Sequence, residues 1–137
     1  MATDIWIHME YRNRKTKKYK YGGKFDGDRL YGVFDIIAGV RGNIKPIYPP
    51  RGLPGDVNNC IYKQYKEGKP DFHTASWLST SEFRECLDAV NEIIREEDKK
   101  EGIIYDPDWA KSYELIYDYM KSYDADGEPA RIVFWFD

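Results

Sequence analysis

The sequence predicts a single α+β domain over residues 1–137, in which a small antiparallel sheet contains both terminal strands. About three helices pack on one face of this sheet, and a long irregular loop connects two of them. Alternating apolar patterns lie near both ends of the chain, and helical periodicity fills much of the region between them. A chain of 137 residues is long enough to bury one core.

The first predicted strand covers residues 4–11, where core-facing residues alternate with residues that point to the opposite face. A charged run at 12–18 predicts a hairpin tip, and residues 19–21 predict the returning strand. We expect the Gly22-Gly23 pair to break that strand. The residues that share the face opposite the core are Asp4, Trp6, His8 and Glu10.

The first helix is predicted from apolar residues at helical spacing over residues 30–40. Asp28 is its candidate N-cap, and Gly39 or Gly42 is expected to end it. Residues 43–76 are predicted to be mostly irregular, because prolines exclude a long helix or a central strand. Short strands are expected within this loop, around residues 44–47 and 60–65.

The next helix has the clearest start in the chain, because Ser79 and Glu82 have the spacing of a capping box. Asp106 and Pro107 predict the start of another helix, with Asp as cap and Pro at the first helical position. Residues 131–137 alternate again and predict the final strand. Trp135 and Arg131 are expected to join the non-core face of the first strand.

Charge is distributed unevenly along the chain, although the net charge is only −3. Residues 1–50 carry 10 basic and 5 acidic side chains, whereas residues 80–137 carry 7 basic and 16 acidic ones. Two isolated cysteines, no signal peptide and no apolar membrane span predict a cytoplasmic protein without a membrane partner. The acidic excess is typical of solvated helix faces, and it can also serve a partner.

Candidate binding residues concentrate in two polar segments, residues 51–56 and 71–78. Arg is well suited to bidentate phosphate recognition, and an adjacent Gly allows the backbone to approach a ligand closely. We expect the segment 51–77 to fold onto the non-core side of the first strand and to form a shared recess there. The predicted ligand-binding residues are Arg41, Arg51, Asp71, His73, Ser76, Trp77, Trp6 and His8.

Other interpretations of the same residues stay open. The non-core sheet face is also typical of a solvated surface or a subunit interface, and the basic hairpin tip is typical of a turn kept soluble by charge. No cofactor, catalytic residue or metal site is assigned. A metal-assisted hydrolase would require Asp4, His8, Asp71 and His73 to hold the ion.

The chain resembles a family of small uncharacterised proteins from phages and prophages. The shared features are an Asp4-Ile5 strand, an Ala38-Gly39-Val40-Arg41 helix end, an Arg51-Gly52-Leu53-Pro54 loop, a block like Asp71-x-His73-Thr74-x-Ser76-Trp77-Leu78, and a terminal strand like Arg131-Ile132-Val133-Phe134-Trp135-Phe136-Asp137. Relatives tend to carry His at the position of Trp6, which puts any chemistry of that His in doubt here.

The resemblance implies an accessory protein that works by binding in the cytoplasm of an infected host and acts against host defences. Its partner would be a phosphorylated nucleotide signal, which it sequesters, or a host defence protein, which it inhibits through the acidic helices. The alternatives are a metal-assisted phosphodiesterase or nucleotide hydrolase, and a homo-oligomeric structural module.

Overall fold

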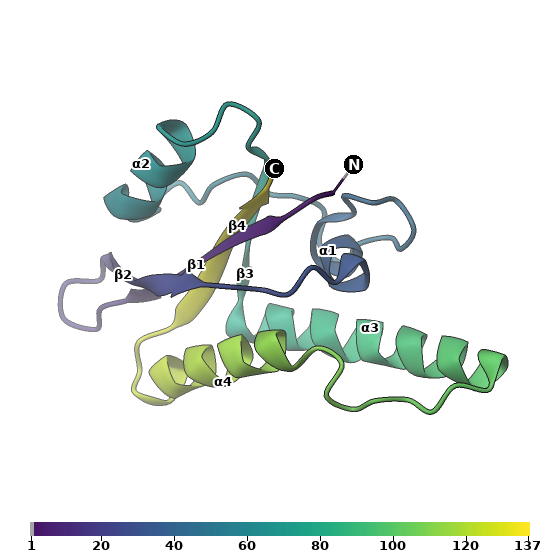
Figure 1. Ribbon diagram of the computed structural model, residues 1–137. Helices are drawn as coiled ribbons and strands as arrows, with labels where there is room; N and C mark the ends of the chain where they lie inside the picture. Colours follow the sequence, from purple (N-terminus) through teal and green to yellow (C-terminus); the bar gives the residue numbers. More distant parts are fainter. Residues whose placement is uncertain (1) are drawn as a thin grey trace.

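The protein has an α+β fold in the computed structural model, which describes residues 2–137. Its sheet is antiparallel and has the strand order β2-β1-β4-β3. The central strands are β1 (Ile5–Arg12) and β4 (Ala130–Phe136), so both terminal strands lie in the sheet as predicted. The edge strands are β2 (Tyr19–Phe25) and β3 (His73–Ser79), as Figure 1 shows.

Four helices occur within residues 2–137, against about three predicted. Helices α1 (Tyr31–Ala38), α3 (Thr80–Glu101) and α4 (Lys111–Ala125) contribute to the larger core on one face of the sheet. Helix α2 (Asn59–Lys66) packs on the other face and lies apart from the other helices in Figure 1. None of these helices is long and apolar enough to cross a membrane.

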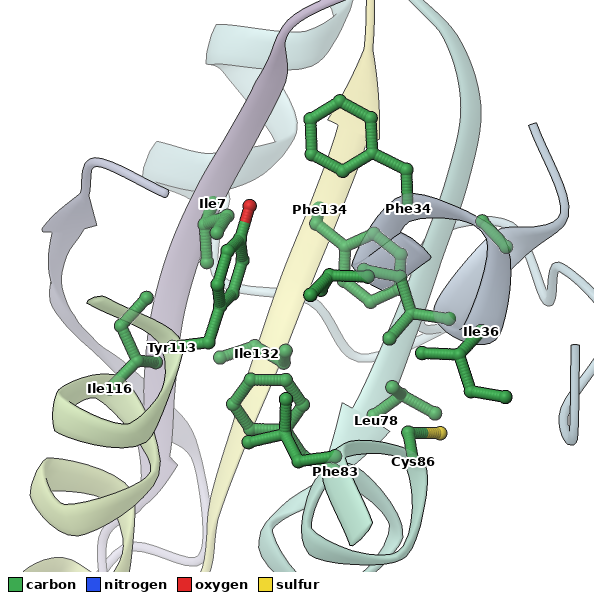
Figure 2. Packing of buried hydrophobic residues seen from close by; sticks show 14 of the residues in the cluster. Ile7, Phe34, Ile36, Leu78, Phe83, Cys86, Tyr113, Ile116, Ile132 and Phe134 are labelled. Atoms are coloured by element: carbon green, nitrogen blue, oxygen red, sulfur yellow. The ribbon is translucent and has the colours of Figure 1, made fainter. Parts of the chain in front are cut away.

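The larger core is built from alternate residues of the strands and from the apolar stripes of three helices. Phe83 of α3, Tyr113 of α4 and Phe134 of β4 are fully buried members of this core, and Figure 2 shows their side chains. Burying a side chain of this size contributes about 2–3 kcal/mol relative to leaving it in water. This face therefore supplies most of the hydrophobic stabilisation of the fold.

Two predicted helix ends are confirmed. Ser79 accepts a hydrogen bond from the backbone N–H of Glu82, and the Glu82 carboxylate accepts one from the backbone N–H of Ser79. Gly39 ends α1 in the left-handed conformation at φ 71°, which glycine adopts without a Cβ penalty. The capping residues at these two ends were therefore readable from local sequence.

Two predicted helix starts are wrong. The N-cap of helix α1 is Leu30, which makes no side-chain capping hydrogen bond. Asp28 lies before the helix, where its backbone carbonyl accepts a hydrogen bond from the Tyr113 hydroxyl. Helix α4 begins at Lys111, because Asp106 accepts from the backbone N–H of Asp108 and closes a separate turn. A short acidic side chain satisfies a turn as readily as a helix end.

The structure also corrects three predictions about strands and the long loop. Strand β2 runs through Gly22-Gly23, and Gly22 is the extra residue of a β-bulge where the register with β1 shifts opposite Met9 and Glu10. Residues 60–65, expected as a strand, belong to helix α2, and residues 44–47 form no strand. Residues 73–76, expected within the mostly irregular segment 43–76, belong to edge strand β3, which runs from His73 to Ser79.

Candidate functional site

The non-core face of the sheet carries a second, smaller cluster of buried side chains. Val133 and Trp135 of β4 pack there with Ala75 of β3 and Ile61 of α2. The chain between residues 51 and 72 lies over this face. This agrees with only part of the expected folding of residues 51–77, because residues 73–77 belong to strand β3 of the sheet itself. The partly buried residues that complete the cluster are Trp6, Leu53, Val57, Tyr65, Phe72 and Trp77.

A buried ion pair fixes this covering segment to the sheet. The Arg131 guanidinium donates to Glu10 at 2.5 Å and to Asp56 at 2.8 Å, and it stacks on the Tyr19 ring at 3.5 Å. Glu10 is 0% exposed and accepts a second hydrogen bond from the backbone N–H of Asn58, the N-cap of α2. Burial raises the pKa of Glu10, whereas the Arg131 hydrogen bond lowers the pKa of Asp56.

A recess of about 380 Å³ opens between this sheet face, the end of α2 and the segment that follows it. Four of its nine lining residues carry aromatic rings. Phe72 lies 5.2 Å from the Trp6 ring and 5.7 Å from the Trp135 ring, measured between centroids. The full lining is Trp6, His8, Lys63, Gln64, Glu67, Gly68, Lys69, Phe72 and Trp135. A volume of this size lies at the low end of small-molecule sites.

Two buried ring nitrogens among the lining residues lack hydrogen-bond partners within the described part of the chain. They are Nε2 of His8 and Nε1 of Trp135, whose side chains are 0% and 1% exposed. The two rings are neighbours, with centroids 4.9 Å apart. A buried polar group without a partner costs about 1–3 kcal/mol, so native proteins contain few of them.

His8 is held neutral by its surroundings. Burial, followed by the positive charge of Lys24, lowers its pKa to about 4. The other ring nitrogen, Nδ1, lies 3.0 Å from the Tyr21 hydroxyl, so the free hydrogen-bonding capacity of the ring is at Nε2. His8 is therefore an uncharged polar group in an aromatic environment at neutral pH.

Basic side chains surround the Trp6 end of the recess. Lys69 lies 5.0 Å from the Trp6 ring centroid and 3.9 Å from the Asp137 carboxylate. Trp6 is oriented by its indole N–H, which donates to Asp137 at 3.1 Å. Lys63 has no acidic partner among residues 2–137. Glu67 supplies one negative charge at the same recess.

The structure brings only two of the eight predicted binding residues, Trp6 and His8, into this recess. Arg51, Ser76 and Trp77 form a separate cluster, in which the Arg51 backbone N–H donates to Ser76 and the guanidinium stacks 4.4 Å from the Trp77 ring. That guanidinium also makes two hydrogen bonds to Glu82, which lower the pKa of this carboxyl to about 2. The arginine fork is therefore already occupied by a carboxylate.

The remaining three predicted residues lie elsewhere. Arg41, just beyond α1, stacks 4.1 Å from the Tyr31 ring and donates to Thr3. His73 is exposed at the start of β3, and Asp71 is exposed two residues before it. The eight residues therefore do not converge on one cavity.

Sequence reasoning missed Phe72, Lys63 and Lys69 as recess residues. A usable signal was present, because Asn58 is a good N-cap, Ile61 and Tyr65 are four residues apart, and Gly68 follows. These features indicate a short amphipathic helix, which in the structure positions Lys63 beside the recess. Because several prolines precede this segment, it was predicted to be part of an irregular loop.

The arrangement of side chains does not favour nucleophilic or metal-assisted catalysis. Within residues 2–137, no three His, Cys, Asp or Glu side chains gather in a way that could hold a metal ion. Cys86 is fully buried in α3, and burial raises the pKa of its thiol to about 12.

Comparison with protein-family models, curated proteins and solved structures finds no match to this chain.

Proposed function

We propose that this protein works by binding a nucleotide in the recess between β1, β4 and α2. The observation that carries the proposal is the combination of aromatic walls and basic side chains in one recess of about 380 Å³. A nucleotide has the matching combination of a planar ring and a negatively charged phosphate. The proposal keeps the ligand class expected from the sequence and moves the site from Arg41 and Arg51 to the recess.

The aromatic walls support recognition of a planar ring. Trp6 and Phe72 contribute large, rigid surfaces with few rotatable bonds, so little side-chain entropy is lost on binding. Stacking of a base on such a side chain contributes about 1–3 kcal/mol. The ring preference is expected to be broad, because every base has a π-face.

The basic side chains support recognition of phosphate. Lys63 has no carboxylate partner in residues 2–137, and its exposed ammonium can turn towards a ligand. The Lys69 pair with Asp137 is long at 3.9 Å, and the lysine side chain is 59% exposed. Such a pair contributes little and exchanges easily for a phosphate.

The resemblance to phage and prophage proteins supplies a biological setting for this binding. A small accessory protein that captures a nucleotide signal would lower its free concentration in the infected cell and so blunt a host defence. No turnover is needed for that effect. We therefore place the protein among sequestering proteins.

The alternatives have less support from the contacts. Three acidic side chains of α3 that would meet a host protein are already engaged: Glu85 with Tyr48, Asp88 with Arg84, and Glu92 with Arg95. The aromatic sheet face that would form a homodimer is covered by α2 and the segment 51–72 of the same chain. No gathered acidic and histidine ligands favour a metal-assisted hydrolase within residues 2–137.

Calorimetric titration of the full chain tests the proposal. The panel contains AMP, GMP, UMP, cyclic dinucleotides and ADP-ribose, with inorganic phosphate and free nucleosides as partial ligands. We expect a mononucleotide to bind more tightly than either partial ligand, and to raise the melting temperature by several degrees near 100 times its Kd. Absence of heat and of any thermal shift across the whole panel would refute nucleotide binding.

Two charge reversals on α2 provide a matched comparison. Lys63 lines the recess, whereas Lys66 lies on the same helix and does not line it. We expect Lys63→Glu to weaken nucleotide binding by about tenfold or more and Lys66→Glu to weaken it much less. Equal losses in the two variants would indicate general charge attraction and would argue against the recess as the site.

A further inference from the structure

The two ring nitrogens without hydrogen-bond partners at the recess indicate which base of a nucleotide would fit there. We propose that the recess selects a 6-oxopurine nucleotide such as GMP, with the base accepting hydrogen bonds from Nε2–H of His8 and Nε1–H of Trp135. This inference rests on the proposed nucleotide-binding function and adds the identity of the base. It uses the only buried side-chain nitrogens or oxygens among residues 2–137 that have no partner.

Trp135 supplies one of the two hydrogen-bond donors in the proposed contact with the base. An indole nitrogen is only a donor, so Nε1 of Trp135 requires an acceptor on the ligand. The side chain is 1% exposed and lines the recess, and its neighbours on the sheet offer no acceptor to this atom. A ligand with an acceptor on its inner edge therefore supplies what the fold leaves unpaired.

His8 supplies the second donor, and its contact with Tyr21 determines which ring nitrogen carries the proton. A phenol is a good donor and a poor acceptor, because its oxygen lone pair is delocalised into the ring. The Tyr21 hydroxyl lies 3.0 Å from Nδ1. We infer from this donor preference that the hydroxyl donates to Nδ1, which places the proton of the neutral imidazole on Nε2. His8 and Trp135 thus present two donors from rings whose centroids are 4.9 Å apart.

Two neighbouring donors distinguish the purines by their edges. Guanine and hypoxanthine present two adjacent acceptors, O6 and N7, whereas adenine presents N7 beside an amino donor. Two donors match the first pattern and leave an adenine amino group facing a donor. Both nitrogens are shielded from water, so a ligand engages them only by shifting the side chains above them.

Binding measurements with four nucleotides test this pattern on the full chain. We expect GMP and IMP to bind with similar affinity, because both retain O6 and N7. AMP is expected to bind at least about tenfold more weakly, and 7-deaza-GMP, which lacks N7, several-fold more weakly than GMP. AMP binding as tight as GMP, or equal binding of 7-deaza-GMP and GMP, would overturn the inference.

Variants test the protein side of the same contact. Trp135→Phe keeps a ring but removes the donor, and is expected to reduce the GMP preference. Tyr21→Phe removes the hydroxyl that sets the His8 tautomer; Tyr21 is 36% exposed, so this variant is expected to fold. It should reduce the GMP-to-AMP ratio several-fold, whereas the exposed control Tyr62→Phe should leave it unchanged.

The outcomes separate this inference from the proposed function. Binding of all four nucleotides with equal affinity would retain the recess as a nucleotide site and refute selection by His8 and Trp135. Binding of none would refute the proposed function, and the base selection with it. If Trp135→Phe fails to fold, the 7-deaza-GMP comparison and Tyr21→Phe still decide the question.

Discussion

The two faces of the sheet are covered in different ways, and the difference separates stability from recognition. The face towards α1, α3 and α4 is closed by interlocking apolar side chains such as Phe83 and Phe134. The opposite face is covered by one short helix and by irregular chain. It holds a buried ion pair, two unpartnered ring nitrogens and an open recess.

This difference shows where the molecule tolerates unfavourable groups. Close packing on one face leaves little space for a ligand and requires few polar partners. The other face keeps His8 neutral and leaves Trp135 without an acceptor, at a cost that the first face must offset.

Truncating the centre of the larger core should cause the greatest loss of stability. Phe83 is 0% exposed, and replacing it with Ala leaves a cavity that the surrounding helices fill only in part. We expect Phe83→Ala to lower the free energy of unfolding by about 3–5 kcal/mol, measured by urea denaturation followed by circular dichroism. A loss below about 1 kcal/mol would contradict the central role of this face; the exposed Tyr62→Ala is the control.

Removing the buried carboxylate should loosen the cover of the second face. Glu10→Gln leaves Arg131 with only the exposed carboxylate of Asp56 as a charged partner. We expect a loss of about 2–3 kcal/mol in the free energy of unfolding, because a buried charge loses its nearest counter-charge. Amide hydrogen exchange should increase first in α2. Uniform exchange across both faces would argue that the ion pair does not act locally.

The buried His8 should make stability depend on pH between about 6.5 and 4. The unfolded chain binds a proton near pH 6.5, whereas the folded chain binds it only near pH 4. Proton uptake therefore favours the unfolded state as the pH falls through this window, at a cost of roughly 3 kcal/mol. His8→Gln should flatten the pH dependence of stability. An unchanged slope would mean that His8 is not the responsible group.

Relieving backbone strain in β3 should have the smallest effect and should raise rather than lower stability. Thr74 has φ 58° within the irregular pairing of β3 with β4, a conformation that is unfavourable for a β-branched residue. We expect Thr74→Gly to stabilise the protein by about 1 kcal/mol, visible as a higher melting temperature. A lower melting temperature would show that the 2.8 Å contact between Thr74 and His73 outweighs the strain.

Local signals in the sequence were sufficient for the sheet centre and for the start of α3. The alternation in β1 and β4 gave both strands with the correct faces, because a period of two fixes the side-chain direction. The Ser79–Glu82 box acts within four residues, so its prediction needed no tertiary information. Such features follow from neighbouring residues alone.

The elements that were missed depend on distant partners. Strand β3 contains a bulge near Thr74, and it is defined as a strand by its pairing with β4 almost sixty residues later. Helix α2 has eight residues and buries only Ile61 fully, so its packing on Trp135 was not evident from local periodicity. The recess lies between β1, β4, the end of α2 and the segment that follows α2. Because α2 and its packing were not predicted, only Trp6 and His8 were anticipated within it.

The distribution of the four tryptophans gives the molecule an internal optical reporter. Trp6 and Trp135 line the recess, whereas Trp77 stacks on Arg51, and Trp109 donates to Asn91 of α3. Replacing Trp77 and Trp109 with Phe would leave indole emission only from the recess. Occupancy of the site could then be followed by quenching in real time, without attaching a dye.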